Sequence, residues 1–240
     1  MTVAPVAAVR AVFRYPVKSM GAEELQTAAV DWYGVVGDRR FGFVQETDAS
    51  AFPWLTIREV PEMTRYRARC GTDPEADAPV VTTPDGRELA VTDPALAEEL
   101  AAAHGQPIRL TRTFRGLFDC FPLSVMSVQT VAGIGALAGR DLQPLRFRPT
   151  ILVDAPGTAY PEDDWVGRTI QFGEGDDAPR MRVDVPDKRC MMINFDHETA
   201  QRDPAVLRAV AQNRDACAGV YGSVERPGVL RAGAPVVLVA

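Results

Sequence analysis

Glycine and proline interrupt this chain so often that they limit the elements it can form. The 240 residues contain 19 glycines and 19 prolines, and the apolar stretches between them are short. Short apolar stretches bounded by turn-forming residues are typical of β-strands, because a long helix needs an uninterrupted periodic pattern. No regular alternation of strand and helix patterns is visible, which argues against a parallel α/β sheet. The pattern predicts an α+β, β-rich fold with a few short helices.

Short strands are expected along the whole chain. They are predicted at 7–17, 24–31, 41–44, 55–59, 63–70, 80–83, 88–91, 108–113, 151–154, 167–172, 181–185, 220–224 and 236–239. Pro84-Asp85-Gly86 separates two of these strands and carries the residue types of a hairpin turn. The most plausible domain boundary lies near 113–122, a segment that reads as a loop.

Three helices are predicted from their N-cap residues. They span 94–104, 128–138 and 204–212, after Asp93, Ser127 and Asp203. Aspartate before proline is a strong start signal, since the carboxylate caps free N–H groups and proline suits the first helical position. In the second helix, the spacing of Val131, Ile134 and Leu137 predicts one inward face.

Charge and hydropathy exclude several classes of protein. A net charge of −6 and a pI near 5.1 argue against a general nucleic-acid binder. No apolar run is long enough to span a membrane, and the N-terminal sequence lacks a secretory signal pattern. We therefore expect a cytoplasmic protein that does not bind membranes, with reduced cysteines. Cys70 and Cys217 read as buried small hydrophobic residues.

A cysteine follows two cations in the segment 184–195. This segment reads as a strand, a basic turn at Lys188-Arg189-Cys190, and a second apolar strand over 191–195. Adjacent cations favour the thiolate form of a cysteine, which attacks electrophiles and binds soft metals. A cysteine followed by apolar residues is more often an inert core residue, so both interpretations stay open here.

Two further basic turns lie in the first part of the chain. Lys18-Ser19 follows a predicted strand and offers a charge, a hydroxyl and free N–H groups, as an anion-binding turn does, although a solvated turn looks the same. Arg39 and Arg40 open another strand, where neighbouring side chains point to opposite faces, so one of them can face a pocket. The alternative is an ion pair with Asp38.

A third basic turn precedes an apolar strand in the second part. Arg146 and Arg148 lie in Arg-Phe-Arg-Pro, directly before the strand 151–154. The loop 115–122 carries Asp119 and Cys120. The sequence thus places polar side chains at the ends of several strands, where one anionic ligand could collect them.

These segments together resemble the MOSC family, which is named for the C-terminal domain of molybdenum cofactor sulfurase. The matching segments, in order, are YPVKS, GDRRF, RFRP, the Glu162–Trp165 loop, Arg189-Cys190 and the closing VLRAGAPV. The chain is similar to two-part members such as the mitochondrial amidoxime-reducing component and its bacterial relatives. The resemblance implies a MOSC N-terminal β-barrel-like subdomain over residues 1–115 and a MOSC-type β-barrel domain over 116–240.

The resemblance also implies a ligand, the molybdenum cofactor, in which a phosphate-bearing pterin (molybdopterin) holds the metal through two sulfurs. On this analogy Cys190 is the protein ligand to molybdenum and the catalytic residue. The residues implied to bind or line the cofactor are Lys18, Ser19, Arg39, Arg40, Asp119, Cys120, Arg146, Arg148, Thr150, Lys188 and Arg189. Arginine and lysine suit this role because they form charge-assisted hydrogen bonds with phosphate.

Two positions depart from the family pattern. Cys120 stands where relatives usually have a small hydroxyl residue, and Thr150 stands where asparagine is expected. Both changes bear on the shape of the pocket and on the substrate more than on cofactor binding.

The implied activity is reduction of N-hydroxylated compounds by a molybdenum-dependent oxidoreductase. The four cysteines of the chain do not show the spacing of an iron–sulfur domain, so a separate electron-transfer protein is the expected partner. The alternative is a non-redox carrier of the molybdenum cofactor, or of sulfur as a persulfide on Cys190. A third hypothesis is a hydrolase or transferase that pairs Cys190 with His197 or His104.

Overall fold

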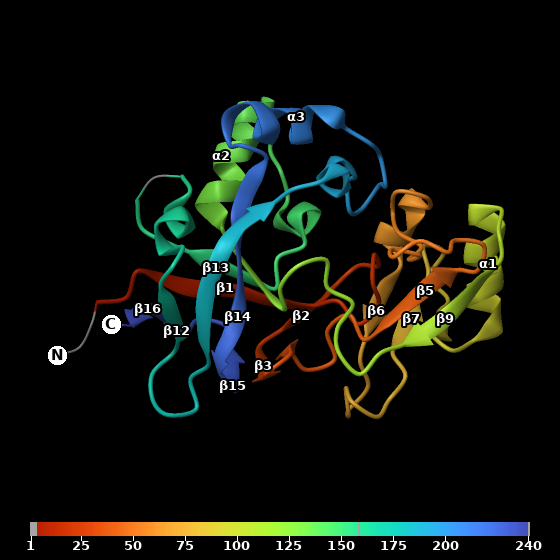
Figure 1. The fold of residues 1–240 in the computed structure, drawn as a ribbon, viewed down its shortest axis with the longest axis horizontal. Helices are drawn as coiled ribbons and strands as arrows, with labels where there is room; N and C mark the ends of the chain where they lie inside the picture. The colour runs from red at the N-terminus through yellow and green to blue at the C-terminus, as the bar shows by residue number, and fades with distance from the viewer. Residues whose placement is uncertain (1–3, 158, 240) are drawn as a thin grey trace.

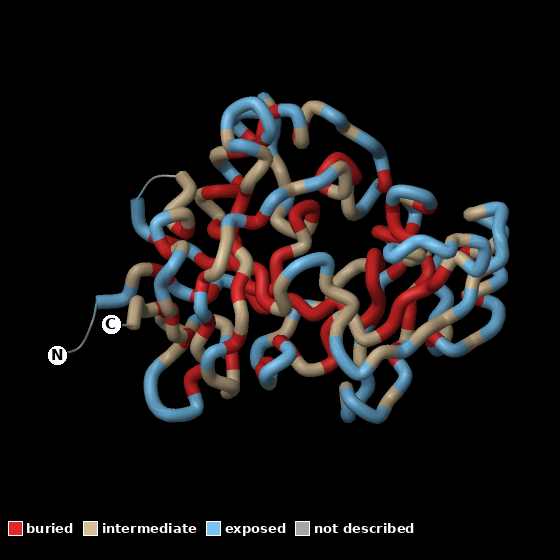
Figure 2. Tube along the Cα trace, in the orientation of Figure 1, coloured by how far each residue is buried: buried red, intermediate tan, exposed pale blue. Residues whose placement is uncertain are grey.

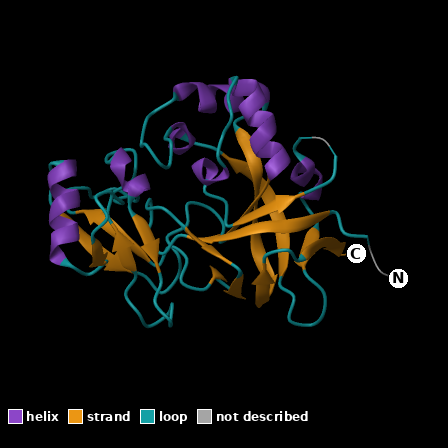
Figure 3. Cartoon of the chain, turned by 180° about the vertical axis from the view of Figure 1, so that it is seen from behind, coloured by secondary structure: helices purple, strands orange, loops and turns teal. Residues whose placement is uncertain are grey.

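The computed structural model describes residues 4–157 and 159–239, which form two bodies lying side by side (Figure 1). The larger body is a β-barrel built from both ends of the chain. The smaller body is built from residues 41–112. The view from behind shows the helices around the outside of the strands in both bodies (Figure 3).

Eight strands form the sheet of the larger body. They are β1 (Ala7–Arg14), β2 (Glu23–Leu25), β10 (Leu123–Ser127), β11 (Ile151–Asp154), β12 (Thr169–Phe172), β13 (Arg180–Lys188), β14 (Cys217–Arg226) and β16 (Pro235–Val239). Their order is β11-β10-β14-β13-β12-β16-β1-β2, and β1 also pairs with β11. Seven strands therefore close into a barrel and β2 lies outside it, which confirms the predicted β-rich α+β fold with a barrel.

The barrel interior is filled with aliphatic side chains. Val12, Ile151 and Val183 are fully buried there, and Trp165 of the 3-10 helix η3 (Pro161–Trp165) packs on the same core. Figure 2 shows this buried centre, surrounded by exposed loops. Each such side chain contributes roughly 1.5–3 kcal/mol through burial, so the barrel is the rigid frame of the molecule.

Two helices cover the outside of the barrel at one end. These are α2 (Val128–Ala138) and α3 (Pro204–Asn213), which pack with β1 and β11 around a second apolar cluster. As predicted, Ser127 caps α2 by accepting from the N–H of Thr130. Leu137 was expected to face inward, but it is exposed because α2 packs through the turns that carry Val131 and Ile134.

The smaller body has its own apolar core. It contains the paired strands β5 (Phe41–Gln45) and β9 (Ile108–Arg112), the sheet of β6 (Arg67–Arg69), β7 (Val80–Thr82) and β8 (Glu88–Ala90), and helix α1 (Pro94–His104). The predicted hairpin at 80–91 is confirmed. Asp93 caps α1 as predicted, and Leu96 and Leu100 bury one face of the helix against the sheets.

A small third sheet joins the two ends of the chain. In it, β15 (Gly228–Arg231) pairs with β3 (Thr27–Asp31), which pairs with β4 (Gly34–Val35). Strands from the start of the chain thus share sheets with strands from its end. β1 and β2 belong to the sheet of the larger body, and β3 pairs with β15. The domain boundary between residues 115 and 116 stays a prediction.

Three predicted strands take another form. Residues 55–59 form a turn after a single bridge at Trp54, and 63–70 divide into η1 (Pro61–Arg65) and the shorter β6. Residues 191–195 were expected to be a strand, but they form η4 (Met191–Asn194). In η4 the consecutive side chains of Met191 and Met192 both pack on the core of the smaller body, which an alternating strand would not allow, and Ile193 packs on the helical cluster.

Among the described residues, no helix is long and apolar enough to cross a membrane.

Candidate functional site

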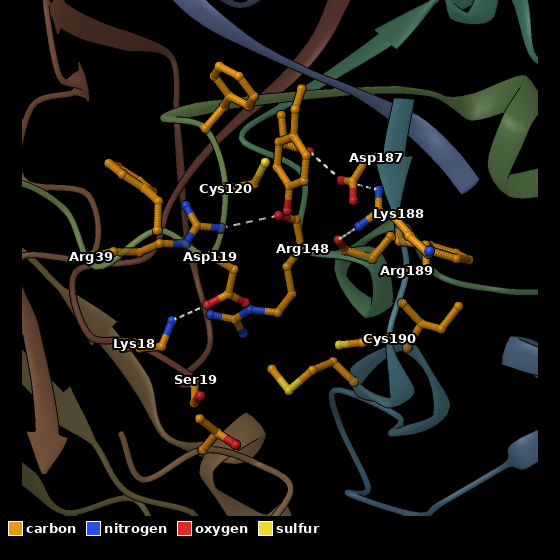
Figure 4. Close-up of a pocket in the computed structure, with 18 of the residues that line it drawn as sticks. Lys18, Ser19, Arg39, Asp119, Cys120, Arg148, Asp187, Lys188, Arg189 and Cys190 are labelled. Atoms are coloured by element: carbon orange, nitrogen blue, oxygen red, sulfur yellow. Dashed lines mark hydrogen bonds and ion pairs between the residues drawn. The ribbon is translucent and has the colours of Figure 1, made fainter. Parts of the chain in front are cut away.

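A cavity of about 340 Å³ opens between the two bodies. The cavity wall comes from several separate segments. They are the turn after β1, the turn before β5, the loop 117–121, the 3-10 helix η2 (Pro144–Phe147), the end of β13 and the start of η4. Phe52, Thr56 and Arg58 of the smaller body complete it. Figure 4 shows side chains from these distant segments turned toward one space.

The cavity concentrates positive charge in an acidic protein. Seven of the described lining residues are cationic, namely Lys18, Arg39, Arg58, Arg146, Arg148, Lys188 and Arg189. Two are acidic, Asp119 and Asp187. The whole chain carries a formal charge of −6, so this excess of cations is local. A partly open cationic cavity of this size favours a small anionic ligand.

Three of the lining residues have left-handed backbone conformations. The φ angles of Ser19, Arg39 and Arg148 are 69°, 51° and 54°. Such conformations cost non-glycine residues about 1 kcal/mol or more and persist where surrounding contacts hold them. Here they turn three polar side chains toward the cavity at the points where a strand or 3-10 helix ends or begins.

Tyr15 is the buried support under two of these arginines. The guanidinium carbons of Arg39 and Arg148 lie 4.5 and 4.3 Å from the centre of its ring. Its hydroxyl donates to the carbonyl oxygen of Pro149 at 3.1 Å, and burial raises its pKa to about 12. Burial lowers the pKa of Arg148 to about 10, so this guanidinium is still charged near neutral pH. Asp38, beneath the cavity, forms an ion pair with Arg39.

Lys18 connects the cavity to the loop 117–121. Its Nζ donates to Oδ1 of Asp119 at 2.6 Å and to the carbonyl oxygen of Leu117 at 2.9 Å. Burial lowers the pKa of Lys18, and the charge of Asp119 opposes this shift. Asp119 keeps an exposed carboxylate on the rim, so an incoming anion can displace it at low cost in desolvation.

Cys190 presents an exposed thiol at the start of η4. The nearest cation is Arg58, whose Nη2 lies 3.6 Å from Sγ. Arg189 is directed away from the thiol, with hydrogen bonds to the carbonyl oxygens of Ala218 and Phe147 at 2.8 and 2.7 Å. Lys188 and Arg189 were both expected to support the thiolate. Arg189 instead binds backbone carbonyl oxygens, and the cation that contacts Sγ is Arg58. The alternative of a buried, inert Cys190 is excluded by its exposure.

Several buried polar atoms of the cavity have no hydrogen-bond partner in the described part of the chain. They include the hydroxyls of Ser19 and Thr150 and Nε of Arg146. Unpaired buried polar groups cost about 1–3 kcal/mol each, so their presence in one cavity indicates a polar ligand. These atoms, the cations and the free thiol fit a phosphate-bearing pterin whose metal accepts a sulfur ligand.

Asp187 is a buried carboxyl that sequence reasoning did not assign to the site. It pairs with Nη2 of Arg189 at 2.8 Å and accepts a hydrogen bond from Ser124 at 3.3 Å. Burial raises its pKa to about 6, and the charge of Arg189 opposes the shift. Its place directly before Lys188 is the signal that could have found it. Arg58 and Phe52 were also missed, and their local sequence offers no comparable signal.

The structure gathers most of the predicted site residues. Those that line the cavity are Lys18, Ser19, Arg39, Asp119, Cys120, Arg146, Arg148, Thr150, Lys188, Arg189 and Cys190. Arg40 does not line it, and its Nε donates to the carbonyl oxygen of Thr113. Cys70 and Cys217 are half-buried, so the expectation of fully buried cysteines is wrong.

The histidines lie outside this cavity. His104 is the last residue of α1, and His197 faces a separate hollow beside Arg65 and Arg67. The hypothesis of a Cys190–histidine pair is therefore not supported by the geometry. In the described residues, no group of three or more histidine, cysteine or acidic side chains is placed to hold a metal.

Two family models together match almost the whole chain. The family model for the MOSC N-terminal beta barrel domain matches residues 6–113, and the model for the MOSC domain matches residues 103–237. The chain therefore belongs to the MOSC family. No curated protein sequence matches it.

Solved structures resemble this chain at low sequence identity, and one of them matches nearly its whole length. The YUAD protein from Bacillus subtilis is 14% identical, with a TM-score of 0.53 over 97% of this chain and 94% of that one. YiiM from Geobacillus stearothermophilus is 22% identical, with a TM-score of 0.38 over 50% of this chain and 54% of that one. YiiM from Escherichia coli is 19% identical, with a TM-score of 0.36 and the same coverage.

Proposed function

We propose that this protein binds the molybdenum cofactor in the cavity, with Cys190 as the protein ligand to the metal. One observation carries the proposal: an exposed thiol and seven cations face the same cavity in an otherwise acidic chain. A thiolate is a soft ligand that suits a sulfur-rich metal centre. Membership of the MOSC family is consistent with this ligand.

Different parts of the cavity would hold different parts of the cofactor. Arg39, Arg148 and Lys18 would bind the phosphate, because they supply charge-assisted donors from backbone turns that are already fixed. The unpaired hydroxyls of Ser19 and Thr150 would bind polar atoms of the pterin. Because these donors are in place before binding, little conformational entropy is lost when the ligand enters.

We further propose that the protein reduces N-hydroxylated compounds such as amidoximes and hydroxylamines. When bound, the cofactor supplies the oxygen-transfer chemistry, and the chain binds and orients it. The overall reaction consumes two electrons and two protons for each N–O bond broken, and releases an amine or amidine and water. The electrons come from a separate electron-transfer protein.

Elemental and pterin analysis tests the cofactor. Protein purified from a host that synthesises the cofactor should contain molybdenum and pterin in amounts near equimolar with the chain. Metal-free protein with a labile sulfur on Cys190 would support the sulfur-carrier alternative instead. Turnover of an amidoxime with a chemical reductant then separates an enzyme from a cofactor carrier.

Replacement of the thiol tests the ligand. Cys190→Ser should keep the fold and most of the pterin, because the cationic turns are unchanged, but should lose at least about 100-fold in reductase rate. Cys120→Ser is the matched control, since Cys120 is also an exposed thiol that lines the cavity. Full activity in Cys190→Ser would refute the metal-ligand assignment.

A further inference from the structure

Three large aromatic side chains are exposed together beside the cavity wall. Trp32, Tyr33 and Phe114 are 63%, 37% and 74% exposed. The first two form the tip of the hairpin between β3 and β4, and Phe114 lies at the start of the loop 113–122. The ring centres of Tyr33 and Phe114 are 6.0 Å apart, edge to face. Clustered exposed aromatic side chains mark interaction sites, whereas single ones are ordinary.

Two arginines frame this cluster. The guanidinium carbon of Arg115 lies 4.6 Å from the ring centre of Tyr33, and that of Arg40 lies 5.5 Å from the ring centre of Phe114. Across the described residues, neither guanidinium has a carboxylate partner. This is notable in a chain with 32 acidic and 26 basic residues. Arginine and aromatic residues are the types that contribute most to protein–protein binding.

The cluster lies on the outer side of a loop whose other residues line the cavity. Phe114 and Arg115 lead directly into residues 117–121, which form part of the cavity wall. Gly34 packs the hairpin against this loop: a Cβ atom there would lie 2.9 Å from the carbonyl oxygen of Pro122. A protein docked on the cluster would thus be separated from the cavity by one loop.

We propose that this aromatic surface, defined as Trp32, Tyr33 and Phe114 with Arg40 and Arg115, docks an acidic electron-transfer protein. Carboxylates on the partner would pair with the two guanidiniums, and apolar contacts would cover the rings. The redox role of the partner rests on the proposed function. Each docked, reduced partner gives up one electron and leaves oxidised, so two dockings supply the electron pair for one N–O bond, with protons from solvent.

Binding tests the surface without any turnover. The probe is a plant-type [2Fe–2S] ferredoxin, a small acidic electron carrier, titrated by calorimetry at low and high ionic strength. Phe114→Ser and Arg115→Glu should each weaken binding at least about tenfold, and added salt should weaken binding to the unchanged protein. Leu137→Ser on α2 and Arg208→Glu on α3, at the opposite edge of the molecule, are matched controls that should bind within about twofold of the unchanged protein (Figure 1).

Turnover separates this inference from the proposed function. Reduced methyl viologen needs no docking surface, so all variants should reduce an amidoxime with it at the same rate. With reduced ferredoxin, the two surface variants should be at least about tenfold slower than the controls. If viologen gives no turnover, the proposed function fails, and calorimetry still decides the docking surface. Absence of ferredoxin binding, equal binding by all variants, or loss of a homodimer in Phe114→Ser would overturn the docking proposal.

Discussion

At the scale of single residues, the setting of Cys190 comes from distant parts of the chain. The sequence placed Lys188 and Arg189 beside the thiol, but neighbouring side chains of an extended segment point to opposite sides. Arg189 accordingly turns to backbone carbonyl oxygens, and Arg58, 132 residues away in the sequence, contacts Sγ. Local charge patterns thus predicted that a cation would be present and misidentified which one.

This arrangement predicts which cation controls the reactivity of the thiol. In cofactor-free protein, Arg58→Met should slow alkylation of Cys190 by iodoacetamide by roughly three- to tenfold, because the guanidinium that contacts Sγ is removed. Methionine keeps much of the arginine stem, so the packing changes little. The rate is measured by mass spectrometry of the labelled peptide.

The matched control is Lys188→Met, which removes a sequence neighbour that has no contact with Sγ. Its alkylation rate should stay within about twofold of the unchanged protein. A larger effect for Lys188→Met than for Arg58→Met would show that the sequence neighbour is the true partner.

Asp187 makes stability depend on pH. Its folded-state pKa is about 6, above the ordinary value of 3.8, because burial disfavours the charged form. Between these values the folded state binds more protons than the unfolded state, so stability falls as pH rises through this window. Asp187→Asn should remove this component, and the loss of unfolding free energy between pH 4.5 and 7.5 should shrink by on the order of 1–3 kcal/mol.

Urea titrations at both pH values provide this measurement. Asp184→Asn is a matched control, since Asp184 lies on the same strand and binds Ser223 outside the cavity. An unchanged pH dependence in Asp187→Asn would mean that another group titrates in this window.

The pair Arg39 and Arg40 shows what residue-level reasoning can predict about the site. Opposite directions of adjacent strand side chains were the reason to expect one arginine in a pocket. Arg39 does line the cavity, but both arginines precede β5 and Arg39 has a left-handed backbone, with φ 51°. The family resemblance assigned both to the cofactor, yet Arg40 faces Thr113 and Phe114. The pair does divide, but a left-handed turn at Arg39 causes this and not strand alternation, so the local pattern did not reveal the cause.

At the scale of elements, capped helices were predictable and 3-10 segments were not. Asp93, Ser127 and Asp203 cap helices where the sequence placed them, because a cap depends on a few neighbouring residues. The segment 191–194 contains residues that suit a strand, but two consecutive side chains, Met191 and Met192, pack on the same core, as a 3-10 turn allows and an alternating strand does not. Tertiary packing overrides such weak local preferences.

Close packing of β13 and β14 gives a prediction at this scale. A Cβ atom on Gly222 would lie 1.9 Å from the carbonyl oxygen of Arg182, so the strands cannot admit even a methyl group without separating. Gly222→Ala should lower the free energy of unfolding by about 2–4 kcal/mol, as severe overpacking does. Urea denaturation of the purified protein measures the change.

Gly86→Ala is the control for this prediction. Gly86 has φ +89° but nothing within 4 Å of the added methyl, so only the backbone preference is affected. Its cost should be about 1–2 kcal/mol. A Gly222→Ala protein as stable as the unchanged one would show that β13 and β14 can separate freely.

At the scale of the whole molecule, the barrel is closed by contacts that no local pattern reveals. β1, at the start of the chain, pairs with β11 and β16, and β3 pairs with β15. The division of the chain near residue 115 stays a prediction, and the structure adds that early strands complete sheets made by late ones. Long-range pairing of this kind depends on the complete set of apolar faces, so strand positions alone did not predict it.

The cavity lies between the two bodies, so a ligand bound there contacts both of them. Binding to the folded state raises stability by mass action, so cofactor-loaded protein should melt on the order of 5 °C above cofactor-free protein. Arg148→Ala should reduce pterin content severalfold and shrink this difference in melting temperature, because it removes a buried cation from the cavity.

Arg214→Ala is the matched control. Arg214 lies over the ring of Tyr160 as Arg148 lies over the ring of Tyr15, but Arg214 lies outside the cavity. Both variants lose a cation–π contact and some stability, so only the loss of pterin distinguishes them. Equal pterin content in the two variants, measured by fluorescence after oxidation, would show that Arg148 supports the fold and does not hold the ligand.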